Sequence, residues 1–277
     1  MPQRSIKVTF LFGVFALSGA ALAEKLQITE DSQLLERIRS RMADHRSRLR
    51  NYTCHVVINR LIRPGNFGQI AHQDQLELEV AFVGERELFA RSGETRFAEQ
   101  AVDHIVPAGL IDNDSFGSHN ELIFFGDAAT FLFLGSTKKD GHQAFRFNFQ
   151  VPERSSRITI TGPAKTNIAV PYKGSLWVDA ETSDVVRLEW ETQITQTFSN
   201  IRAIHKVVRY KAARIGDSDF MLPLNSTLAA ANKDGTYLLN IIRLERCLEF
   251  RGESTITFDA PAAGAAGSEQ HATKSEH

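Results

Sequence analysis

Apolar and polar residues alternate strictly along several stretches of the chain, at 75–82, 145–150, 157–161 and 186–191. Because successive side chains of a strand point to opposite faces, this pattern predicts strands with one apolar and one solvated face. Less strict runs predict further strands at 53–62, 86–91, 129–135, 174–179, 203–213, 223–231, 236–250 and 253–258. The chain is therefore expected to be mainly β.

Short turn sequences separate many of these strands, among them Lys139-Asp140-Gly141 and Lys233-Asp234-Gly235. Short connections join antiparallel neighbours, whereas a parallel crossover needs about a dozen residues or more. No helix-length segment interrupts the strands after Ala129. The pattern thus predicts one long antiparallel meander of about eleven strands.

One helix is predicted ahead of the strands, from Thr29 to Leu49. Its apolar residues recur at helical spacing, and Thr29 or Asp31 could cap its first turn. They are Leu34, Leu35, Ile38, Met42 and Leu49. Six arginines between 37 and 50 cover the rest of the helix. They predict a solvated face on a helix packed against the sheet, and the alternative is contact with an anionic membrane surface.

The segment from Phe97 to Asp127 breaks the strand pattern. It is rich in loop residues, with helix-compatible pieces at about 98–106 and 118–126. Long insertions in compact domains usually serve as lids or binding loops, so we expect a helical lid at 98–127. A structural flap over a sheet edge is the equally weighted alternative. Asp112 and Asp114 faintly suggest a cation site, but turn chemistry explains them better.

Both ends of the chain differ from the middle. Residues 1–23 have a basic start, a short apolar run and the exit Ala21-Leu22-Ala23, which predicts a signal peptide cleaved after Ala23. An uncleaved membrane anchor is the alternative. Cleavage would leave 30 basic and 33 acidic residues, a formal net charge of −3, which argues against a nucleic-acid partner. We expect a periplasmic or secreted protein with one domain at 24–259 and a disordered tail at 260–277.

The two cysteines, Cys54 and Cys247, both lie in the predicted exported part. An even number of cysteines in an oxidising compartment favours a disulfide, and two buried free thiols are the alternative. Alternation places Cys54 on an apolar face and Cys247, between Glu245 and Glu249, on a solvated one. A β-bulge must therefore shift one strand, or the predicted bridge is wrong.

No motif for catalysis or metal binding is present. None of the nine histidines forms a His-x-x-x-His pair or lies beside a cysteine at ligand spacing, so no metal and no cofactor are expected. Nucleophile elbows and glycine-rich phosphate loops are also missing. We therefore expect a protein that is not an enzyme, although catalytic groups can also assemble from distant positions.

The most conspicuous feature is the apolar face of the sheet, to which many of the 19 phenylalanines contribute. One helix and a short insertion are a thin cover for a sheet of this size, so part of the face could line a ligand cavity. The predicted lining residues are Val56, Ile58, Leu76, Leu78, Val80, Phe82, Phe131, Phe133, Phe145, Phe147, Phe149, Ile158, Ile160, Val186, Leu188 and Trp190.

This layout resembles the LolA/RseB superfamily of periplasmic lipoprotein-binding proteins, with the stretch from Lys173 to Glu189 as the most similar piece. Asn51-Tyr52-Thr53-Cys54 and the region after Cys247 also resemble a subfamily of exported bacterial proteins. The resemblance implies a large, unclosed antiparallel β-barrel with an N-terminal helix and a helical lid. It implies no individual ligand-contacting residue.

Three functions are compatible with these observations. The first is a non-enzymatic carrier of a hydrophobic ligand, such as a lipid or a lipoprotein acyl chain. The second is an envelope sensor or scaffold that binds a protein partner through a strand edge or the first helix. The third is an unrecognised hydrolase with a polar triad inside the cleft. No nucleic acid is expected as a partner, and no membrane span is expected after cleavage.

Overall fold

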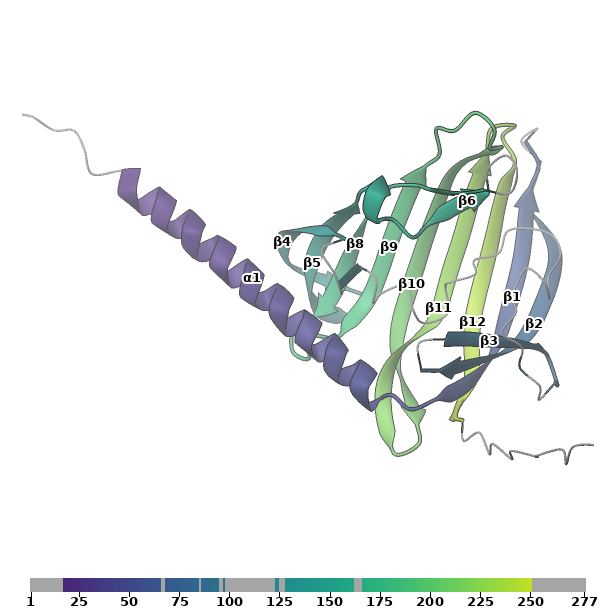
Figure 1. The fold of residues 1–277 in the computed structure, drawn as a ribbon, viewed down its shortest axis with the longest axis horizontal. Coiled ribbons are helices and arrows are strands. Elements are labelled where there is room, and N and C mark those ends of the chain that lie inside the picture. Colours follow the sequence, from purple (N-terminus) through teal and green to yellow (C-terminus); the bar gives the residue numbers. More distant parts are fainter. Residues whose placement is uncertain are drawn as a thin grey trace, which may run out of the picture.

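The computed structural model describes residues 17–65, 68–84, 86–94, 97, 123–124, 128–161 and 166–250, with side chains from residue 31 onward except those of His142 and Thr161. One long helix, α1 (Leu17–Arg48), precedes the strands (Figure 1). The other elements are β1 (Tyr52–Arg63), β2 (Ala71–Val83), β3 (Arg86–Arg91), β4 (Thr130–Lys139), β5 (His142–Val151), η1 (Glu153–Ser155), β6 (Thr159–Thr161), β7 (Asn167–Ala169), β8 (Tyr172–Asp179), β9 (Val185–Gln193), β10 (Ile201–Ile215), β11 (Ser218–Asn232) and β12 (Tyr237–Glu249).

Ten strands form a single curved sheet in the order β3-β2-β1-β12-β11-β10-β9-β8-β5-β4, and every described neighbouring pair is antiparallel. The sheet is not closed into a barrel, as expected. The predicted single meander is wrong in one respect, because β1 pairs with β12 and so brings the first and last strands together. The strands β3 and β4, although consecutive in the sequence, are the two edges. Alternation cannot reveal such a long-range pairing.

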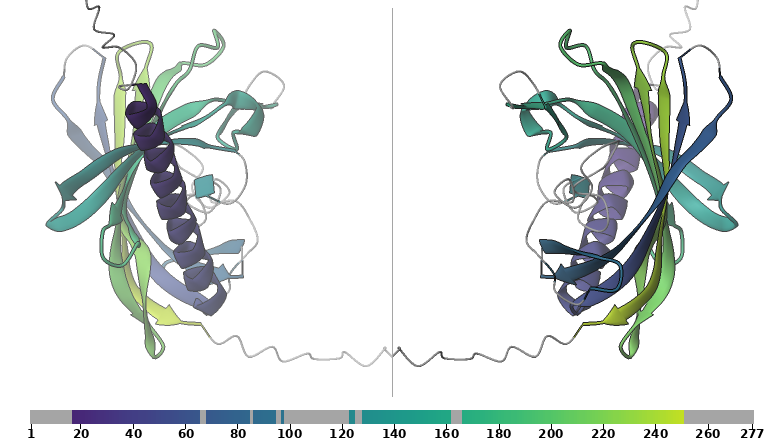
Figure 2. Two further views of the ribbon diagram at one scale, coloured as in Figure 1. Left: turned by 90° about the vertical axis from the view of Figure 1, so that its left-hand side faces the viewer. Right: turned by 90° about the vertical axis from the view of Figure 1, so that its right-hand side faces the viewer.

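The helix α1 begins at Leu17, twelve residues before the predicted start, and ends at Arg48. The added residues are mostly Ala, Leu, Glu, Lys and Gln, which favour helix, and no proline interrupts them. The helix therefore continues through the predicted cleavage site after Ala23. Figure 2 shows α1 and the β6–β7 hairpin on the same side of the large sheet, which is its concave face.

A proline lies inside the central strand β11. The predicted strand was 223–231, which would have begun at this Pro223. The strand instead begins at Ser218, and its register with β10 shifts between Arg209 and Lys211, opposite Pro223. Proline is tolerated at such a bulge because the regular ladder is already interrupted there.

A disulfide joins Cys54 of β1 to Cys247 of β12, with a Cα–Cα distance of 4.1 Å. The register of these strands shifts between Thr53 and His55, and Arg246 has a φ of 51°. This is the β-bulge that the alternation required. It turns the Cys247 side chain onto the apolar face, where Cys247 packs with the core residues around Cys54.

The small β6–β7 hairpin crosses the upper end of the concave face (Figure 1). Ile160 of this hairpin forms a buried cluster with Val170 and Ile194, against which Ile158 and Ile204 pack. Since Ile204 lies on β10 of the large sheet, the cluster attaches the hairpin to the concave face. The predicted strand at 253–258, the tail at 260–277 and residues 1–16 of the predicted signal peptide lie outside the described residues.

Candidate functional site: the concave face

Two apolar clusters cover the concave face. The disulfide-side cluster consists of Tyr52, Cys54, Val56, Ile58, Leu78, Val80, Phe82, Phe89, Ile215, Phe220, Leu222, Ile242 and Leu244. The helix-side cluster consists of Leu34, Ile38, Ile123, Phe124, Phe147, Phe149, Val151, Tyr172, Leu176, Val178, Val185, Leu188, Trp190 and Val208. The first is built on β1, β2, β3, β12 and the adjoining ends of β10 and β11. The second is built on the other half of the sheet and on α1.

A continuous row of paired residues shows that both clusters belong to one face. Residues opposite each other in neighbouring antiparallel strands point to the same side of the sheet. In strand order, the row is Phe133, Phe147, Leu176, Leu188, Val208, Ser226, Ile242, Ile58 and Leu76. Ser226 is its one polar residue. The open sheet thus has an apolar band across its width.

Most of the predicted lining residues lie on this face. Val56, Ile58, Leu76, Leu78, Val80 and Phe82 belong to or pack against the disulfide-side cluster. Phe131, Phe133, Phe145, Phe147, Phe149, Leu188 and Trp190 belong to or pack against the helix-side cluster. Ile158 packs against the helix-side cluster and against the hairpin cluster that contains Ile160.

Val186 is an exception. Its predicted position beside Leu188 and Trp190 is wrong, because Val186 is buried with Ala144 and Trp177 in a separate cluster. The register between β8 and β9 shifts between Trp177 and Val178, which breaks the alternation and places Val185 in the helix-side cluster instead.

A pocket of about 450 Å³ opens at the rim of the concave face, between the ends of β5, β8 and β9. Its lining combines Val151 and Tyr172 of the helix-side cluster with polar residues, among them Lys173, Glu191 and Thr192. The Thr192 hydroxyl donates a 2.6 Å hydrogen bond to the carbonyl of Pro171. Burial raises the pKa of Tyr172 to about 12, so its phenol stays neutral at physiological pH.

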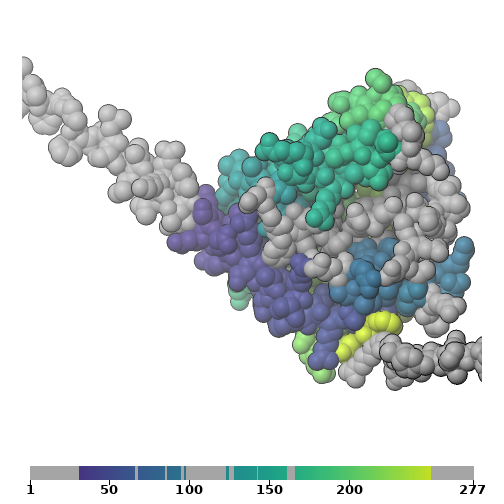
Figure 3. Space-filling view, viewed as in Figure 1, coloured from purple at the N-terminus to yellow at the C-terminus, as the bar shows by residue number. Residues whose placement is uncertain are grey.

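The helix α1 packs on this face through the predicted stripe. Leu34 and Ile38 are buried in the helix-side cluster, and Leu35 and Met42 pack beside them. Leu49, just after the helix, packs against the disulfide-side cluster instead. In the space-filling view, the part of α1 from residue 31 onward follows one rim of this face (Figure 3). The helix therefore covers the face while contacting both clusters.

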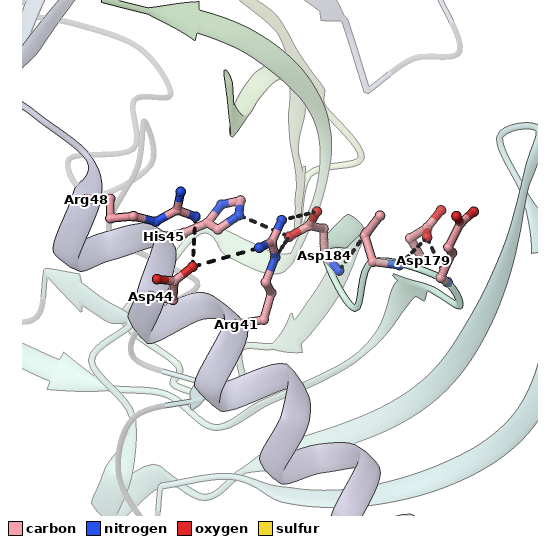
Figure 4. Close-up of polar contacts among 8 residues, drawn as sticks. Arg41, Asp44, His45, Arg48, Asp179 and Asp184 are labelled. Carbon is pink, nitrogen blue, oxygen red and sulfur yellow. Dashed lines mark hydrogen bonds and ion pairs between the residues drawn. The ribbon is translucent and has the colours of Figure 1, made fainter. Parts of the chain in front are cut away.

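A charged contact fixes α1 to the turn between β8 and β9 (Figure 4). The Arg41 guanidinium donates to both carboxylate oxygens of Asp184, at 2.8 and 3.3 Å. His45 Nε2 lies 3.3 Å from the same carboxylate. The hydrogen bond that Arg41 donates to Asp184 raises the pKa of Arg41, whereas burial lowers the pKa of His45.

The turn that carries Asp184 is itself well ordered by hydrogen bonds. The Asp179 carboxylate accepts from the backbone N–H groups of Glu181 and Thr182, each at 2.9 Å. The backbone N–H of Asp179 donates to the carbonyl of Asp184 at 2.8 Å. Nothing in the sequence indicated that Asp184 would meet Arg41.

Of the predicted lid at 98–127, only Ile123 and Phe124 are among the described residues. Both are buried in the helix-side cluster, and the Phe124 ring stacks on Phe131 with a centroid distance of 5.6 Å. The possible cation ligands Asp112 and Asp114 lie outside the described residues. Elsewhere in the part of the chain that is described, no group of three or more His, Cys, Asp or Glu side chains could hold a metal ion.

Three buried polar residues also lie on the concave face and were not singled out from the sequence. Lys206, Asn240 and Arg60 are 0%, 3% and 7% exposed. They occupy one cross-strand row, which runs from Trp190 through Lys206, Leu228, Asn240 and Arg60 to Asp74. The alternation Ile204, Lys206, Val208 was the available signal, because it places the lysine on the apolar side.

No family model and no curated protein matches the sequence. Among solved structures, a LolA superfamily protein from Nitrosomonas europaea aligns with a TM-score of 0.39 and 12% identity, over 80% of this chain and 94% of that one. A putative outer membrane lipoprotein-sorting protein domain from Vibrio parahaemolyticus gives 0.37 and 9%, over 77% and 90%. A DUF1329 family protein from Desulfovibrio piger gives 0.38 and 11%, over 80% and 92%.

The LolA superfamily, which the sequence resembles, is thus named among the structural matches. The open antiparallel sheet with a helix across its concave face is the architecture that this resemblance implied. At these TM-scores and identities the likeness is no guide to ligand or partner.

Proposed function

We propose that this protein is a non-enzymatic carrier that binds a hydrophobic ligand, such as a lipid or a lipoprotein acyl chain, on its concave face. The observation that carries the proposal is the apolar band across an open sheet, with a 450 Å³ pocket at its rim. A sheet that needed only a stable core could bury this band under a fixed second layer. Here α1 and the β6–β7 hairpin provide cover in the described part of the chain.

The cover of this face is suited to displacement. The part of α1 after residue 31 is held by the buried side chains of Leu34 and Ile38, by Leu35 and Met42 beside them, and by the contacts of Asp184. Ile123 and Phe124 support the proposal that the insertion at 98–127 acts as the lid, since both contact the helix-side cluster. An acyl chain that replaced such contacts would gain about 0.8 kcal/mol for each buried methylene.

The proposal is tested by extracting lipid from the purified full chain and measuring it by mass spectrometry. Val151→Arg places a guanidinium at the wall of the rim pocket, while Gln143→Arg adds the same charge at an exposed position of the same strand. We expect wild type and Gln143→Arg to carry similar amounts of lipid and Val151→Arg to carry several-fold less, at matched melting temperatures. Wild-type protein free of lipid and unable to bind the neutral dye Nile red would refute the carrier function.

The edge strand β4 favours a second candidate, a scaffold that binds a protein partner by adding a strand. Leu132 and Leu134 of β4 are 62% and 45% exposed, on the face opposite Phe131 and Phe133. An edge with exposed apolar residues is a template for pairing with another strand. Pull-down from envelope extracts tests this candidate, and loss of one partner upon Leu132→Lys with Leu134→Lys, but not upon Arg37→Glu in α1, would support it.

We further propose that residues 1–23 are a signal peptide and that the mature chain begins at Glu24, in a periplasmic or extracellular space. The intact mass of the protein recovered from the envelope fraction tests this. A mass that includes residues 1–23 would refute it. Among the residues described, no helix has the length and apolar character needed to cross a membrane.

A further inference from the structure

A second pocket, of about 300 Å³, is lined by residues of β5, β8, β9 and β10. Its residues Arg146 and Asn148 alternate along β5 with the phenylalanines of the helix-side cluster, so their side chains point to the convex face of the sheet. Ser175 of β8 pairs with Asn148 and shares this face. Phe149 and Trp190 also border the pocket. Arg146, Asn148 and Ser175 do not line the rim pocket, so they mark this pocket as a distinct site.

A chain of hydrogen bonds orients the polar side chains of this convex pocket. A terminal nitrogen of the Arg146 guanidinium donates to Ser175 Oγ at 3.2 Å. The Ser175 hydroxyl in turn donates to Asn148 Oδ1 at 2.7 Å. This bond engages the oxygen of the Asn148 amide, whose nitrogen carries two N–H donors. No described residue accepts a hydrogen bond from these two donors. The guanidinium and the amide thus lie around one hydroxyl group, with donors available for a further acceptor.

Arg146 has no acidic partner among the described residues. Its guanidinium lies over the ring of Trp177, 5.3 Å from the ring centroid. Its Nε atom is buried and donates to no described acceptor. Buried donors without an acceptor are uncommon in folded proteins, and one explanation for such a donor is a bound ion or water. The pocket therefore offers a cation and several N–H donors to a ligand that supplies acceptor oxygens.

The other acidic and basic residues that line the convex pocket are already paired. Lys173 lies 3.5 Å from Glu191, across neighbouring strands. Glu189 is bound by the Arg187 guanidinium, which lies beside the pocket. These pairs offset each other's charge, so Arg146 leaves one positive charge without a counterpart. A single negative charge on the ligand would balance it.

We propose that the convex pocket binds a small polar carboxylate, whose carboxylate group is held by Arg146 and Asn148. A planar guanidinium matches the two oxygens of a carboxylate, and one unpaired cation suits a monoanion better than a phosphate dianion. The rest of the ligand meets Gln150, Glu191 and His205, which favour hydroxyl or amide groups over an acyl chain. A volume of 300 Å³ is at the small end of the range for ligand pockets. This second site does not depend on the proposed carrier function.

Isothermal titration calorimetry of the full chain, at pH 7 and constant ionic strength, tests the proposal. The probes are lactate, gluconate and N-acetylglycine, each compared with its uncharged amide, and inorganic phosphate. At least one carboxylate should bind about tenfold or more tightly than its amide, because hydrogen bonds to charged groups are the stronger ones. If inorganic phosphate binds more tightly than every carboxylate, the assigned ligand class is wrong.

Two substitutions locate the binding. Asn148→Asp replaces the amide donors with a carboxylate of the same shape, which pairs with Arg146 and repels the ligand. Arg146→Met removes the charge while keeping an apolar stem on the Trp177 ring. Each should weaken carboxylate binding by about tenfold or more. Arg202→Met removes the same charge at an exposed position outside the pocket and should bind as wild type does.

Nile red binding separates this site from the lipid site. It should be unchanged in Asn148→Asp and Arg146→Met, because neither residue lines the rim pocket. Asn148→Asp remains informative if Arg146→Met folds poorly by circular dichroism, since the substituted side chain has the same size. The proposal is overturned if wild type binds no carboxylate better than its amide. It is also overturned if carboxylate binding is as tight in the folded variants as in wild type.

Discussion

The two halves of the concave face are held together by different means. In the disulfide-side half, a covalent bond joins β1 to β12, and the first and last strands pair along eleven register positions. In the helix-side half, the second layer is α1, which reaches the sheet through buried apolar residues and the contacts of Asp184. The first half is fixed by a covalent bond, whereas α1 is held on the second by non-covalent contacts alone.

Removing the disulfide should cause the largest loss of stability among the variants that test this comparison. The bond closes a loop with a sequence separation of 193 residues, so the chain-entropy model gives roughly 5 kcal/mol of stabilisation. We expect Cys54→Ala with Cys247→Ala to lower the free energy of unfolding by about 2–5 kcal/mol in guanidinium chloride. Wild type with and without reductant provides the matched control. A loss below about 1 kcal/mol would mean that the strand pairing alone holds this half closed.

Truncating the helix contact should have the next largest effect. Ile38 is fully buried in the helix-side cluster, so Ile38→Ala should cost about 2–4 kcal/mol. Hydrogen exchange should accelerate in residues 31–48 well before it accelerates in β1 and β12. Arg37→Ala, at the exposed neighbouring position, is the control. Equal acceleration in all these elements would contradict the idea that the two halves open separately.

The sequence predicted the individual strands better than the register between them. Alternation identified the strands and most of the apolar face, since each strand's facing depends on its own residues. It failed at Val186, where a register shift between neighbouring strands changes the facing. It also could not decide whether Cys247 faced Cys54, because the bulge at Arg246 is a local backbone conformation.

Apart from the predicted disulfide, contacts between distant segments could not be predicted from the sequence. The stripe of α1 was predicted, but its partners were not, and neither was the contact of Arg41 with Asp184, 143 residues apart. Lys206 shows the opposite case, since its place on the apolar side followed from alternation. Asn240 and Arg60 lie in the same cross-strand row as Lys206 only because β10, β11, β12 and β1 pair in this order, which the sequence did not reveal.

The charged contact of α1 provides a milder test of the same comparison. Asp184→Asn removes the carboxylate that binds Arg41, and we expect a loss of about 1 kcal/mol because the pair is only partly buried. Faster hydrogen exchange in α1 would report the loosened helix. Asp44→Asn, which removes exposed contacts with Arg48 and Arg41 within α1 itself, should cost less than about 0.5 kcal/mol. Equal losses of stability in the two variants would show that the contact between α1 and the sheet contributes no more than an exposed contact within α1.

Acid should loosen the helix-side half slightly, through His45. Burial is the largest cause that lowers the pKa of His45, and the neighbouring charges of Arg41 and Arg48 act in the same direction against the attraction of Asp184. A folded-state pKa below the ordinary value means that the unfolded chain binds the proton more readily. Stability is therefore highest above the ordinary histidine pKa, about 6.5, and is lost as the pH falls below that value toward the folded-state pKa.

The measurement is the free energy of unfolding at pH 7.5 and at successively lower pH values, compared between wild type and His45→Gln. Protonated His45 would lie 3.3 Å from Asp184, which offsets part of the burial cost, so we expect the smallest of the four effects here. The wild-type protein should lose slightly more stability than the variant over this range. A steeper loss in the variant would mean that attraction to Asp184 outweighs burial, and that acid tightens the hold of α1 on the sheet.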